Sequence, residues 1–366
     1  MIEVRGKGCV VARIIAHSAS STSSQELLTY ELEYPRFIHS ELMTHRLFSR
    51  NAASSRAIPV KAMLEQVRSN PAMPIHWGAN QPGMQAKDEG NNAVYLKEVL
   101  AWEAQPDADL FEVVDLSYSR EDAWFVAAES VADIAESFSK AGYHKQIVNR
   151  LLEPFQIMKT VVTATEFDNF FYLRCHADAQ PEIKELAECM YQALQQSAAE
   201  VLHPGEWHTP YVSFDVISRV HFIDLGPEKD QKWITIEEAL KISASCCAQV
   251  SYRKSDDSLE KALLVYDRLV ESKPVHASPF EHQGSPMRGV DTQEPDGWQF
   301  LINHSGYPVS WEVGITHSDR DGRLWSGNFK SWIQYRQMIK DNVCWEYPVG
   351  VQDEECDYGL ASISAT

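Results

Sequence analysis

The chain has 366 residues, of which 33 are Lys or Arg and 52 are Asp or Glu, so its formal net charge is −19. This composition is typical of a globular protein with one large core or two domains, and it argues against intrinsic disorder. The acidic balance argues against a general nucleic-acid-binding surface, because such proteins present a basic face that displaces counterions from phosphates. Any bound phosphate should therefore meet a local cluster of arginines.

Two further features limit the class of protein. The seven cysteines include an adjacent pair, Cys246 and Cys247, but no CxxC spacing, which indicates neither a disulfide framework nor a zinc site. The N-terminus lacks the pattern of a signal peptide, and no run of about 18 apolar residues occurs in the chain. We therefore expect reduced thiols in a cytoplasmic protein that does not enter a membrane.

Along the chain, CVVARIIAHS (9–18) and LLTYELEYP (27–35) have the pattern of strands. Pro35 suits the first turn of a helix that would end near Ser49, with an apolar face formed by Phe37, Ile38, Leu42 and His45. SRNAASSR would then be the loop that leaves this helix.

The rest of the first half is expected to be mainly helical. Residues 71–92 are rich in Pro, Gly and Asn and indicate an irregular excursion. A helical pattern covers 119–161, with a break at 142–144, and another helix covers 180–202, with Pro181 at its start. The first half thus contains two or three strands and several helices.

The second half begins with a predicted helix at 235–248 and a short strand, QVSY (249–252). An amphipathic helix follows in DSLEKALLVYDRLVES (257–272), and KPVHASPFEHQGSP (273–286) is expected to be a turn.

The stretch THRLFSRNAASSR (44–56) concentrates polar side chains. The planar guanidinium groups of Arg46, Arg50 and Arg56 can bind a phosphate or a carboxylate. Further hydrogen-bonding groups come from Ser49, Asn51, Ser54 and Ser55. The alternative is a solvated helix end whose Ser and Asn cap backbone groups and whose arginines pair with the surplus carboxylates. The pattern alone leaves both interpretations open.

Other groups of polar residues are weaker candidates for a functional site. In HASPFEHQG, His276, Glu281 and His282 do not have HExxH spacing and Pro279 interrupts any helix, so a metal site is not expected. His282 could instead stack on a planar ligand or be a buried structural histidine.

Arg150 and Arg174 each stand in an otherwise apolar helical stretch. A buried arginine is costly unless it is paired, so each should be an ion-pair partner or a ligand contact. The chain has no GxGxxG, P-loop or GxSxG motif and no recognisable cysteine nucleophile motif.

THRLFSRNAASSRA resembles the signature RHRxxSxNExSxRY of the flavin-dependent thymidylate synthases. The matching positions are His45, Arg46, Ser49, Asn51, Ser54 and Arg56, whereas Thr44, Ala52 and Ala57 depart from the signature. VNRLLEP and NFFYLRCHADAQPEI resemble the two helices that follow in the family, in the same order. Three further stretches also resemble long variants of the family found in bacteriophage genomes: FIHSELMTHR, SSRAIP and GEWHTPYV. For a chain encoded by a phage, the expected location would be the cytoplasm of the host cell.

The family's Pro-Phe-Glu-His turn, which normally precedes the signature, is found here in the second half as AQVSY followed by SPFEH (278–282). GNFKSWIQYRQM (327–338) resembles a worn counterpart of the helix that leads into the signature. We therefore expect a divergent duplication. Its parts would be an N-terminal synthase-like unit at 1–222, a linker at 223–231, a C-terminal synthase-like unit at 232–345 and a tail at 346–366.

The resemblance implies an α+β fold with a mixed or antiparallel sheet and packed helices, in two related units. It implies FAD-dependent transfer of a one-carbon unit from methylenetetrahydrofolate to C5 of dUMP, with NADPH as the reductant. Because compact family members are homotetramers, a doubled chain is expected to be a homo-oligomer, either a dimer equivalent to that tetramer or a tetramer.

The resemblance also implies, position by position, which residues contact the cofactor and which contact the substrate. FAD would contact His45, Arg46, Ser49, Asn51, Asn169 and His282. The dUMP phosphate would lie against Ser54, Ser55, Arg56 and Arg150. Arg174 would bind the substrate beside the pyrimidine as the catalytic residue, because a fixed positive charge stabilises negative charge that develops on the ring.

Ala52 is the most serious departure, since the family has a Glu at this position. Glu281 or Glu206 could compensate for its loss. Alternatively, the pocket is retuned to methylate or hydroxymethylate dUMP or dCMP, or the chain binds flavin or nucleotide without turnover.

Overall fold

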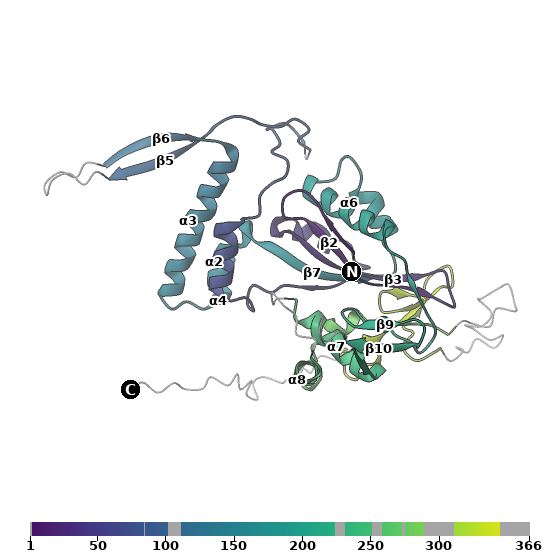
Figure 1. The fold of residues 1–366 in the computed structure, drawn as a ribbon. Coiled ribbons are helices and arrows are strands. Elements are labelled where there is room, and N and C mark those ends of the chain that lie inside the picture. The colour runs from purple at the N-terminus through teal and green to yellow at the C-terminus, as the bar shows by residue number, and fades with distance from the viewer. Residues whose placement is uncertain are drawn as a thin grey trace, which may run out of the picture.

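The computed structural model describes residues 2–83, 85–101, 111–223, 231–250, 258–272, 275–288 and 311–344. It combines helices with mainly antiparallel sheets, which confirms the α+β class (Figure 1). The expected linker lies mostly outside these residues, and the expected tail lies entirely outside them. The relation between two duplicated units stays a prediction.

A six-stranded sheet forms the centre of the fold. Five of its strands are antiparallel, in the order β1 (Ile2–Arg5), β2 (Val11–Ser20), β3 (Glu26–Pro35), β7 (Ile157–Ala164) and β4 (Ser49–Ala52). The sixth strand, β8 (Glu200–Leu202), is parallel to β2. The strands expected at 9–18 and 27–35 are confirmed as β2 and β3.

The strand β3 is covered on both faces. Leu28, Tyr30 and Leu32 belong to the main apolar core, in which α6 (Pro181–Gln195) contributes Ile183 and Leu186. On the opposite face, Leu27 packs with Leu202, Phe329 and Trp332. Because successive side chains of a strand point to opposite faces, this double cover explains why Leu27 to Leu32 are all buried.

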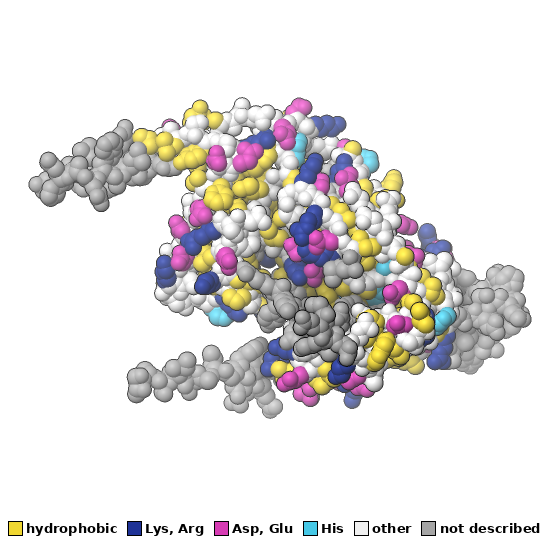
Figure 2. Space-filling view, in the orientation of Figure 1, with side chains coloured by type: hydrophobic (Ala, Val, Ile, Leu, Met, Phe, Trp, Pro, Cys, Tyr) yellow, Lys and Arg dark blue, Asp and Glu magenta, His cyan; other side chains and the backbone are white. Residues whose placement is uncertain are grey.

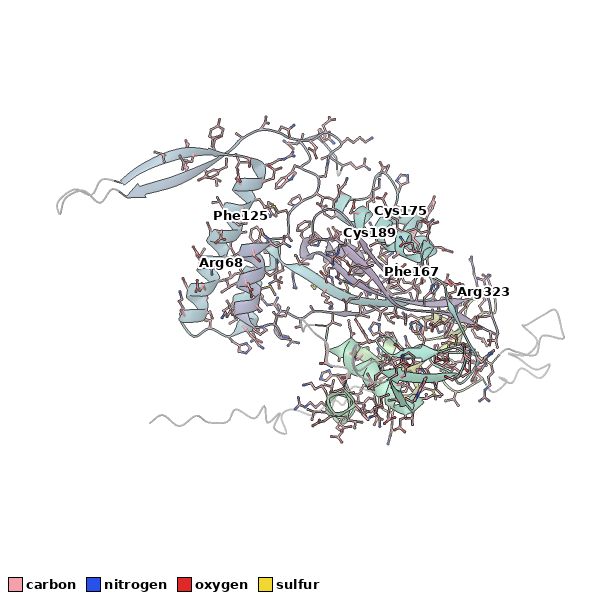
Figure 3. All side chains as sticks on the ribbon, viewed as in Figure 1. Arg68, Phe125, Phe167, Cys175, Cys189 and Arg323 are labelled. Carbon is pink, nitrogen blue, oxygen red and sulfur yellow. The ribbon has the colours of Figure 1, made fainter. Side chains whose placement is uncertain are left out.

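Three helices form a second core beside the sheet (Figure 1). Apolar residues of α2 (Val60–Ser69), α3 (Arg120–Lys140) and α4 (Lys145–Leu151) pack together with Phe155. Arg68, labelled in Figure 3, lies on α2 and donates to Asp133 on α3 at 2.7 Å and to Glu136 at 2.9 Å. A hairpin of β5 (Val94–Ala101) and β6 (Phe111–Tyr118) extends from the N-terminal end of α3 (Figure 1).

The remaining elements of the first half connect these parts. They are η1 (Arg36–Ile38), α1 (His39–Met43), η2 (Glu153–Phe155) and α5 (Asp168–Arg174). Residues 71–83 and 85–92 form an irregular excursion with an isolated bridge between Gly78 and Glu89, as expected.

Residues 213–223 and the second half supply small elements that lie below the sheet in Figure 1. A three-stranded sheet of β9 (Ser213–Asp215), β10 (Val220–Ile223) and β11 (Lys232–Ile234) packs on α7 (Ile236–Ala248). The helix α8 (Leu259–Glu271) lies beside α7. The other elements are η3 (Ser278–Glu281), β12 (Gly284–Pro286), β13 (His317–Ser318), β14 (Leu324–Ser326), β15 (Phe329–Lys330), β16 (Trp332–Gln334) and η4 (Tyr335–Met338).

The helices of the second half begin where the sequence indicates. Thr235 and Glu238 form a capping box at the start of α7, and the Ser258 hydroxyl accepts from the backbone N–H of Lys261 at the start of α8. The amphipathic helix is therefore confirmed.

Several expected helices are strands in the structure. Residues 157–164, expected to be helical, form β7, because the β-branched run from Thr160 to Thr163 is buried between β3 and β4. The helix expected at 180–202 ends at Gln195 and is followed by β8. The helical counterpart expected at 327–338 is instead β15, β16 and η4.

Two further expectations fail near the signature and near α7. The helix expected to reach Ser49 ends at Met43, and residues 49–52, expected to be a loop, pair with β7 as the edge strand β4. His45 therefore lies in a turn. Gln249 and Val250, expected to begin a strand, form a turn, and residues 251–252 lie outside the described chain.

A chain of buried hydrogen bonds joins the segment after β8 and the second half to the sheet. His208 bonds Ser18 and Thr29, each at 2.8 Å, and Thr29 bonds Thr163 at 2.8 Å. Thr163 in turn bonds His282 Nδ1 at 2.8 Å. All five side chains are buried, so none of these polar groups can turn to water instead.

Replacing Thr163 with Val tests this chain of bonds. The two side chains have nearly the same shape, but the variant leaves His282 Nδ1 without its partner and removes one of the two bonds of the Thr29 hydroxyl, which keeps its bond to His208. We expect the free energy of unfolding to fall by about 1–3 kcal/mol, measured as a lower urea midpoint with an unchanged slope. An unchanged midpoint would show that the bonds contribute nothing to stability.

The two buried histidines predict how stability depends on pH. Burial lowers the pKa of His208 and of His282 to about 3, whereas an unfolded histidine titrates near 6.5. The contribution of the two histidines to the free energy of unfolding is therefore complete above pH 6.5. This contribution is lost as the pH falls toward 3, by about 2 kcal/mol for each histidine at pH 5. Urea unfolding at pH 7.5 and pH 5.0 measures this loss. The variant H208Q should show a smaller loss than the native protein, and an equal loss would contradict the assignment.

Candidate functional site

The signature residues occupy a turn, an edge strand and a loop. Residues 44–48 form the turn, Ser49–Ala52 form β4, and residues 53–59 lead into α2. Pairing with β7 sets the direction of the strand's side chains, so Ser49 and Asn51 point to one face and Arg50 to the other.

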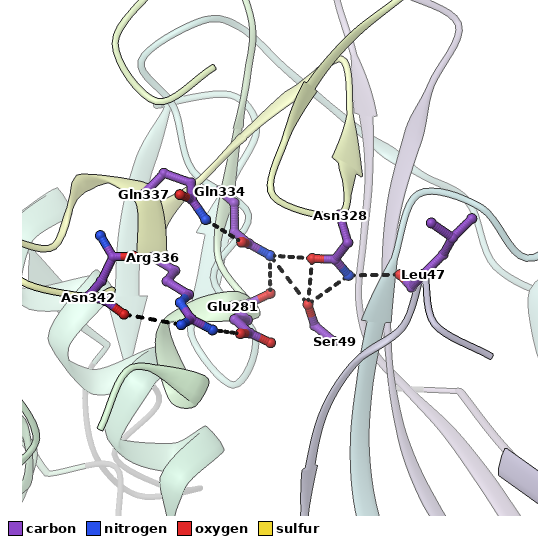
Figure 4. A network of polar contacts seen from close by, with 8 residues as sticks. All are labelled: Leu47, Ser49, Glu281, Asn328, Gln334, Arg336, Gln337 and Asn342. Atoms are coloured by element: carbon purple, nitrogen blue, oxygen red, sulfur yellow. Dashed lines mark hydrogen bonds and ion pairs between the residues drawn. The ribbon is translucent and has the colours of Figure 1, made fainter. Parts of the chain in front are cut away.

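The second half holds the signature turn in place through side-chain amides (Figure 4). Asn328 Nδ2 donates to the carbonyl of Leu47 at 2.8 Å and to the Ser49 hydroxyl at 3.0 Å. Gln334 Nε2 donates to Asn328 Oδ1 at 2.7 Å and to the Ser49 hydroxyl at 3.3 Å. Ser49 is therefore bonded within the chain and is only 1% exposed.

The two carboxylates that could compensate for Ala52 are already paired. Glu281 forms an ion pair with Arg336 (Figure 4). Glu206 accepts from Arg219 Nε at 2.7 Å and from the backbone N–H of His203. Neither one lines the cleft described next.

An open cleft of about 410 Å³ lies at the free edge of β4, and we call it the signature cleft. One side comes from the signature and the other from the second half, in the order Arg50, Asn51, Ala52, Ser54, Ala57, Cys247, Ala248, Val250, Leu269, His276, Ser278 and Pro279. None of these described lining residues is acidic. The cleft has the size of a small-molecule site and polar groups with net positive character.

The helix α4 fixes the loop that follows β4. Asn149, which is fully buried, donates from Nδ2 to the carbonyls of Ser55 at 2.7 Å and Ile58 at 3.0 Å. Lys145 Nζ donates to the carbonyl of Ala57 at 3.2 Å. Three loop carbonyls are thus held toward α4, while Arg56 remains exposed.

Arg174, at the end of α5, reaches the signature turn. Its Nε donates to His45 Nε2 at 3.0 Å and its Nη2 donates to the Thr44 hydroxyl at 3.1 Å. Burial first, and then the charges of Arg174 and Arg50, lower the pKa of His45 to about 4. His45 is therefore neutral near pH 7 and accepts the bond from Arg174. Its ring also packs on Phe170, with a centroid distance of 4.8 Å.

The ion pairs distinguish the signature arginines from most of the others. Paired arginines in the described chain are Arg5, Arg13, Arg36, Arg68, Arg120, Arg150, Arg219, Arg288, Arg320, Arg323 and Arg336. No described carboxylate forms an ion pair with the three signature arginines or with Arg174. The exposed Arg268 on α8 also has no ion pair among the described residues. Acidic and basic side chains otherwise lie interspersed on the face in Figure 2. The interpretation that the signature arginines pair with surplus carboxylates is therefore wrong for the described chain.

The expected contact residues differ in their access to a ligand. Arg46, Arg56 and Asn169 are exposed, and His45, Asn51 and Ser54 are half-buried. Ser55 is 8% exposed, and Ser49 and His282 are enclosed by the chain itself. His282 Nε2 has no hydrogen-bond partner among the described residues, but the ring is 0% exposed.

Arg150 is not the buried arginine that its apolar helix indicates. Its side chain is 66% exposed and lies 3.8 Å from Glu153. The neighbouring Asn149 takes the buried position instead. In the sequence, a polar residue between Val148 and Leu151 indicates a buried polar contact at Asn149. Its partners, the carbonyls of Ser55 and Ile58, could not be known from the pattern.

Within the described residues, no group of three or more His, Cys, Asp or Glu side chains is placed to bind a metal ion. The described cysteines, which exclude Cys356, are free thiols. None of the described helices is both long and apolar enough to span a membrane.

The family model described as "Thymidylate synthase complementing protein" (Thy1) matches residues 4–199, more than half of the chain. No curated protein matches the chain.

Two solved structures are similar to the chain. The UMP/dUMP methylase PolB from Streptomyces cacaoi bound with 5-Br UMP is 18% identical, with a TM-score of 0.35, and the match covers 53% of this chain and 92% of that one. PolB bound with 5-Br dUMP is 15% identical, with a TM-score of 0.36, and covers 53% of this chain and 93% of that one.

Replacing Asn149 with Ala tests whether α4 orders the signature loop. We expect faster amide hydrogen exchange in residues 54–58, because the carbonyls of Ser55 and Ile58 lose their donor. Exchange measured by mass spectrometry should not change in α6. The variant Q146A removes an exposed side chain of the same helix and serves as the control. Equal exchange in N149A and Q146A would contradict the assignment.

Proposed function

Because the chain belongs to the thymidylate synthase complementing protein (Thy1) family, we propose that it carries out FAD-dependent transfer of a one-carbon unit from methylenetetrahydrofolate to C5 of dUMP. NADPH is the proposed reductant. The proposal includes a homo-oligomer as the working assembly.

One observation carries the proposal beyond the family. In a chain with a net charge of −19, the signature arginines and Arg174 form no ion pair with a described carboxylate. Guanidinium groups that are kept apart from acidic side chains can bind the phosphate of a nucleotide through charge-assisted bonds. This supports a site for anionic small molecules.

The residues around the signature fit FAD in part. His45, Arg46, Asn51 and Asn169 present polar atoms at or near the surface and would hold the cofactor. Ser49 and His282 are enclosed, so we assign them to the support of β4 rather than to cofactor contact. Reduced FAD supplies the carrier for the one-carbon unit when it is bound.

The nucleotide would lie beside the loop after β4. Ser54, Ser55 and Arg56 are proposed to hold its phosphate, together with Arg150. Arg174 is proposed to lie by the pyrimidine, where its positive charge stabilises negative charge that develops as C5 attacks. Neutral His45 fixes the direction of this guanidinium by accepting from Nε.

A second candidate is methylation or hydroxymethylation of a different pyrimidine nucleotide, such as dCMP. It is favoured by Ala52, since no acidic side chain among the described lining residues of the signature cleft replaces the family's Glu. A carboxylate accepts hydrogen bonds from a base, so its absence changes which base edge the site can recognise.

Mass spectrometry of the nucleotide product tests the proposal. The purified protein is incubated with FAD, NADPH, methylenetetrahydrofolate and either dUMP or dCMP. Methylated dUMP would support the proposed reaction, and a hydroxymethylated or cytosine-derived product would support the retuned enzyme. A protein that binds flavin but forms no product with either nucleotide would be a binding homologue.

Arg174→Ala tests the proposed catalytic residue. We expect turnover to fall about 10²- to 10³-fold, because one preorganised stabilising charge is removed. Thermal unfolding should change much less than turnover. Arg268→Ala removes an exposed arginine that also lacks an ion pair in the described chain, and it should retain full activity. Equal product formation by R174A and R268A would refute the assignment.

A further inference from the structure

Thr44 stands where the family signature has its first arginine, so the resemblance gives this residue no function. It follows Met43, the last residue of α1, and its backbone N–H donates to the carbonyls of Glu41 and Leu42. The Thr44 hydroxyl also donates to the carbonyl of Glu41, at 2.7 Å. Because a hydroxyl has a single proton, this bond leaves the Thr44 oxygen able to accept a further hydrogen bond but not to donate one.

The group that meets this oxygen is the guanidinium of Arg174. Arg174 Nη2 donates to the Thr44 hydroxyl at 3.1 Å, and Nε donates to His45 Nε2 at 3.0 Å. These two nitrogens form one edge of the planar guanidinium, so two neighbouring residues hold the same edge. A rigid planar group that is bonded at two points along one edge has a fixed direction. Thr44 therefore sets the direction of Arg174 together with His45.

The bonded edge leaves the other end of the guanidinium for a ligand. Nη1 of Arg174 forms no hydrogen bond with the residues that the structure describes. An arginine at position 44 could not hold Arg174 in this way, because it offers donors only and would place a second positive charge beside the first. Threonine supplies an acceptor and leaves the charge of Arg174 unneutralised.

The hydroxyl of Thr44 also caps a carbonyl at the end of α1, which is a structural role. The bond to Arg174, in contrast, lies at the surface. Water replaces a lost hydrogen bond at such a place, so this bond contributes little to the free energy of unfolding. Its loss should change the direction of the guanidinium more than the stability of the fold.

We propose that Thr44 is a positioning residue that orients the guanidinium of Arg174 toward the pyrimidine. The inference rests on the proposed function, in which Arg174 stabilises negative charge on the ring. A fixed charge acts on the transition state only when it points to the place where the opposite charge develops, and small displacements cost large factors in rate. Thr44 acts through Arg174 and does not itself contact the substrate.

Steady-state kinetics with dUMP compare Thr44→Val and Thr44→Ser with the wild-type protein. Valine has nearly the shape of threonine but accepts no hydrogen bond, whereas serine keeps the hydroxyl. We expect T44V to lower kcat about tenfold and to change KM for dUMP less than about twofold, because orientation acts on the transition state. T44S should keep kcat within about twofold of wild type. Ser40→Ala is the matched control, since it removes an exposed hydroxyl of α1 that bonds Glu41 rather than Arg174.

A double-mutant cycle separates positioning from a structural role. If Thr44 acts through Arg174, T44V should lower kcat in the wild-type background and should have no further effect in R174A protein. Thermal melting checks the folding of each variant. An equal loss in both backgrounds, an equal loss for T44V and T44S, or full turnover by T44V would overturn the proposal.

The titration of His45, followed by NMR, gives a second readout that needs no turnover. Burial, and then the charges of Arg174 and Arg50, lower the pKa of His45 to about 4. A guanidinium released from Thr44 moves its positive charge away, so the pKa of His45 should rise in T44V, rise most in R174A and stay unchanged in T44S. An unchanged pKa of His45 in T44V would contradict the proposal.

The kinetic measurements also separate this inference from the proposed function. Product formation from dUMP at equal rates by wild-type protein and T44V would keep the function and overturn the inference. Wild-type protein that forms no product from dUMP would overturn the proposed function and this inference with it.

Discussion

The strands β3 and β7 need an apolar and hydrogen-bonding cover on both faces, and the second cover comes from distant parts of the chain. Thr29 bonds His208, 179 positions away, and Thr163 bonds His282, 119 positions away. Because the Thr163 hydroxyl and the His282 imidazole are buried, the bond between them forms only when the second half is docked. At Gly284 the backbone comes so close that an added Cβ would lie 2.6 Å from Leu27.

This docking also builds the candidate site. The edge strand β4 carries the signature, and the amides of Asn328 and Gln334 fix the turn before it through Leu47 and Ser49. The lining of the signature cleft then combines β4 with residues of α7, α8 and the turn at 276–279. A single cover thus stabilises the sheet and supplies one wall of the cleft, so stability and ligand binding depend on the same contacts.

The electrostatic character of the site follows from where acidic side chains are committed. Glu281 and Glu206 pair with Arg336 and Arg219, respectively, and do not line the signature cleft. Arg50 and Arg174 bind a backbone carbonyl and a neutral histidine, so their charge is oriented without being neutralised. Local positive charge in a strongly acidic protein favours an anionic ligand at this place rather than over the whole surface.

The sequence by itself determined the local features: the alternation of β2 and β3, the capped starts of α7 and α8, and the concentration of arginines in the signature. These depend on neighbours within a few residues, and the family's motif could be recognised from them. Only the tertiary structure decided that residues 157–164 and 49–52 are paired strands, since a short β-branched run becomes a strand when a partner lies beside it. It also decided that Arg50 lines the cleft while Arg150 faces solvent, because burial and ion pairing of a long side chain are set by distant segments that local patterns do not specify.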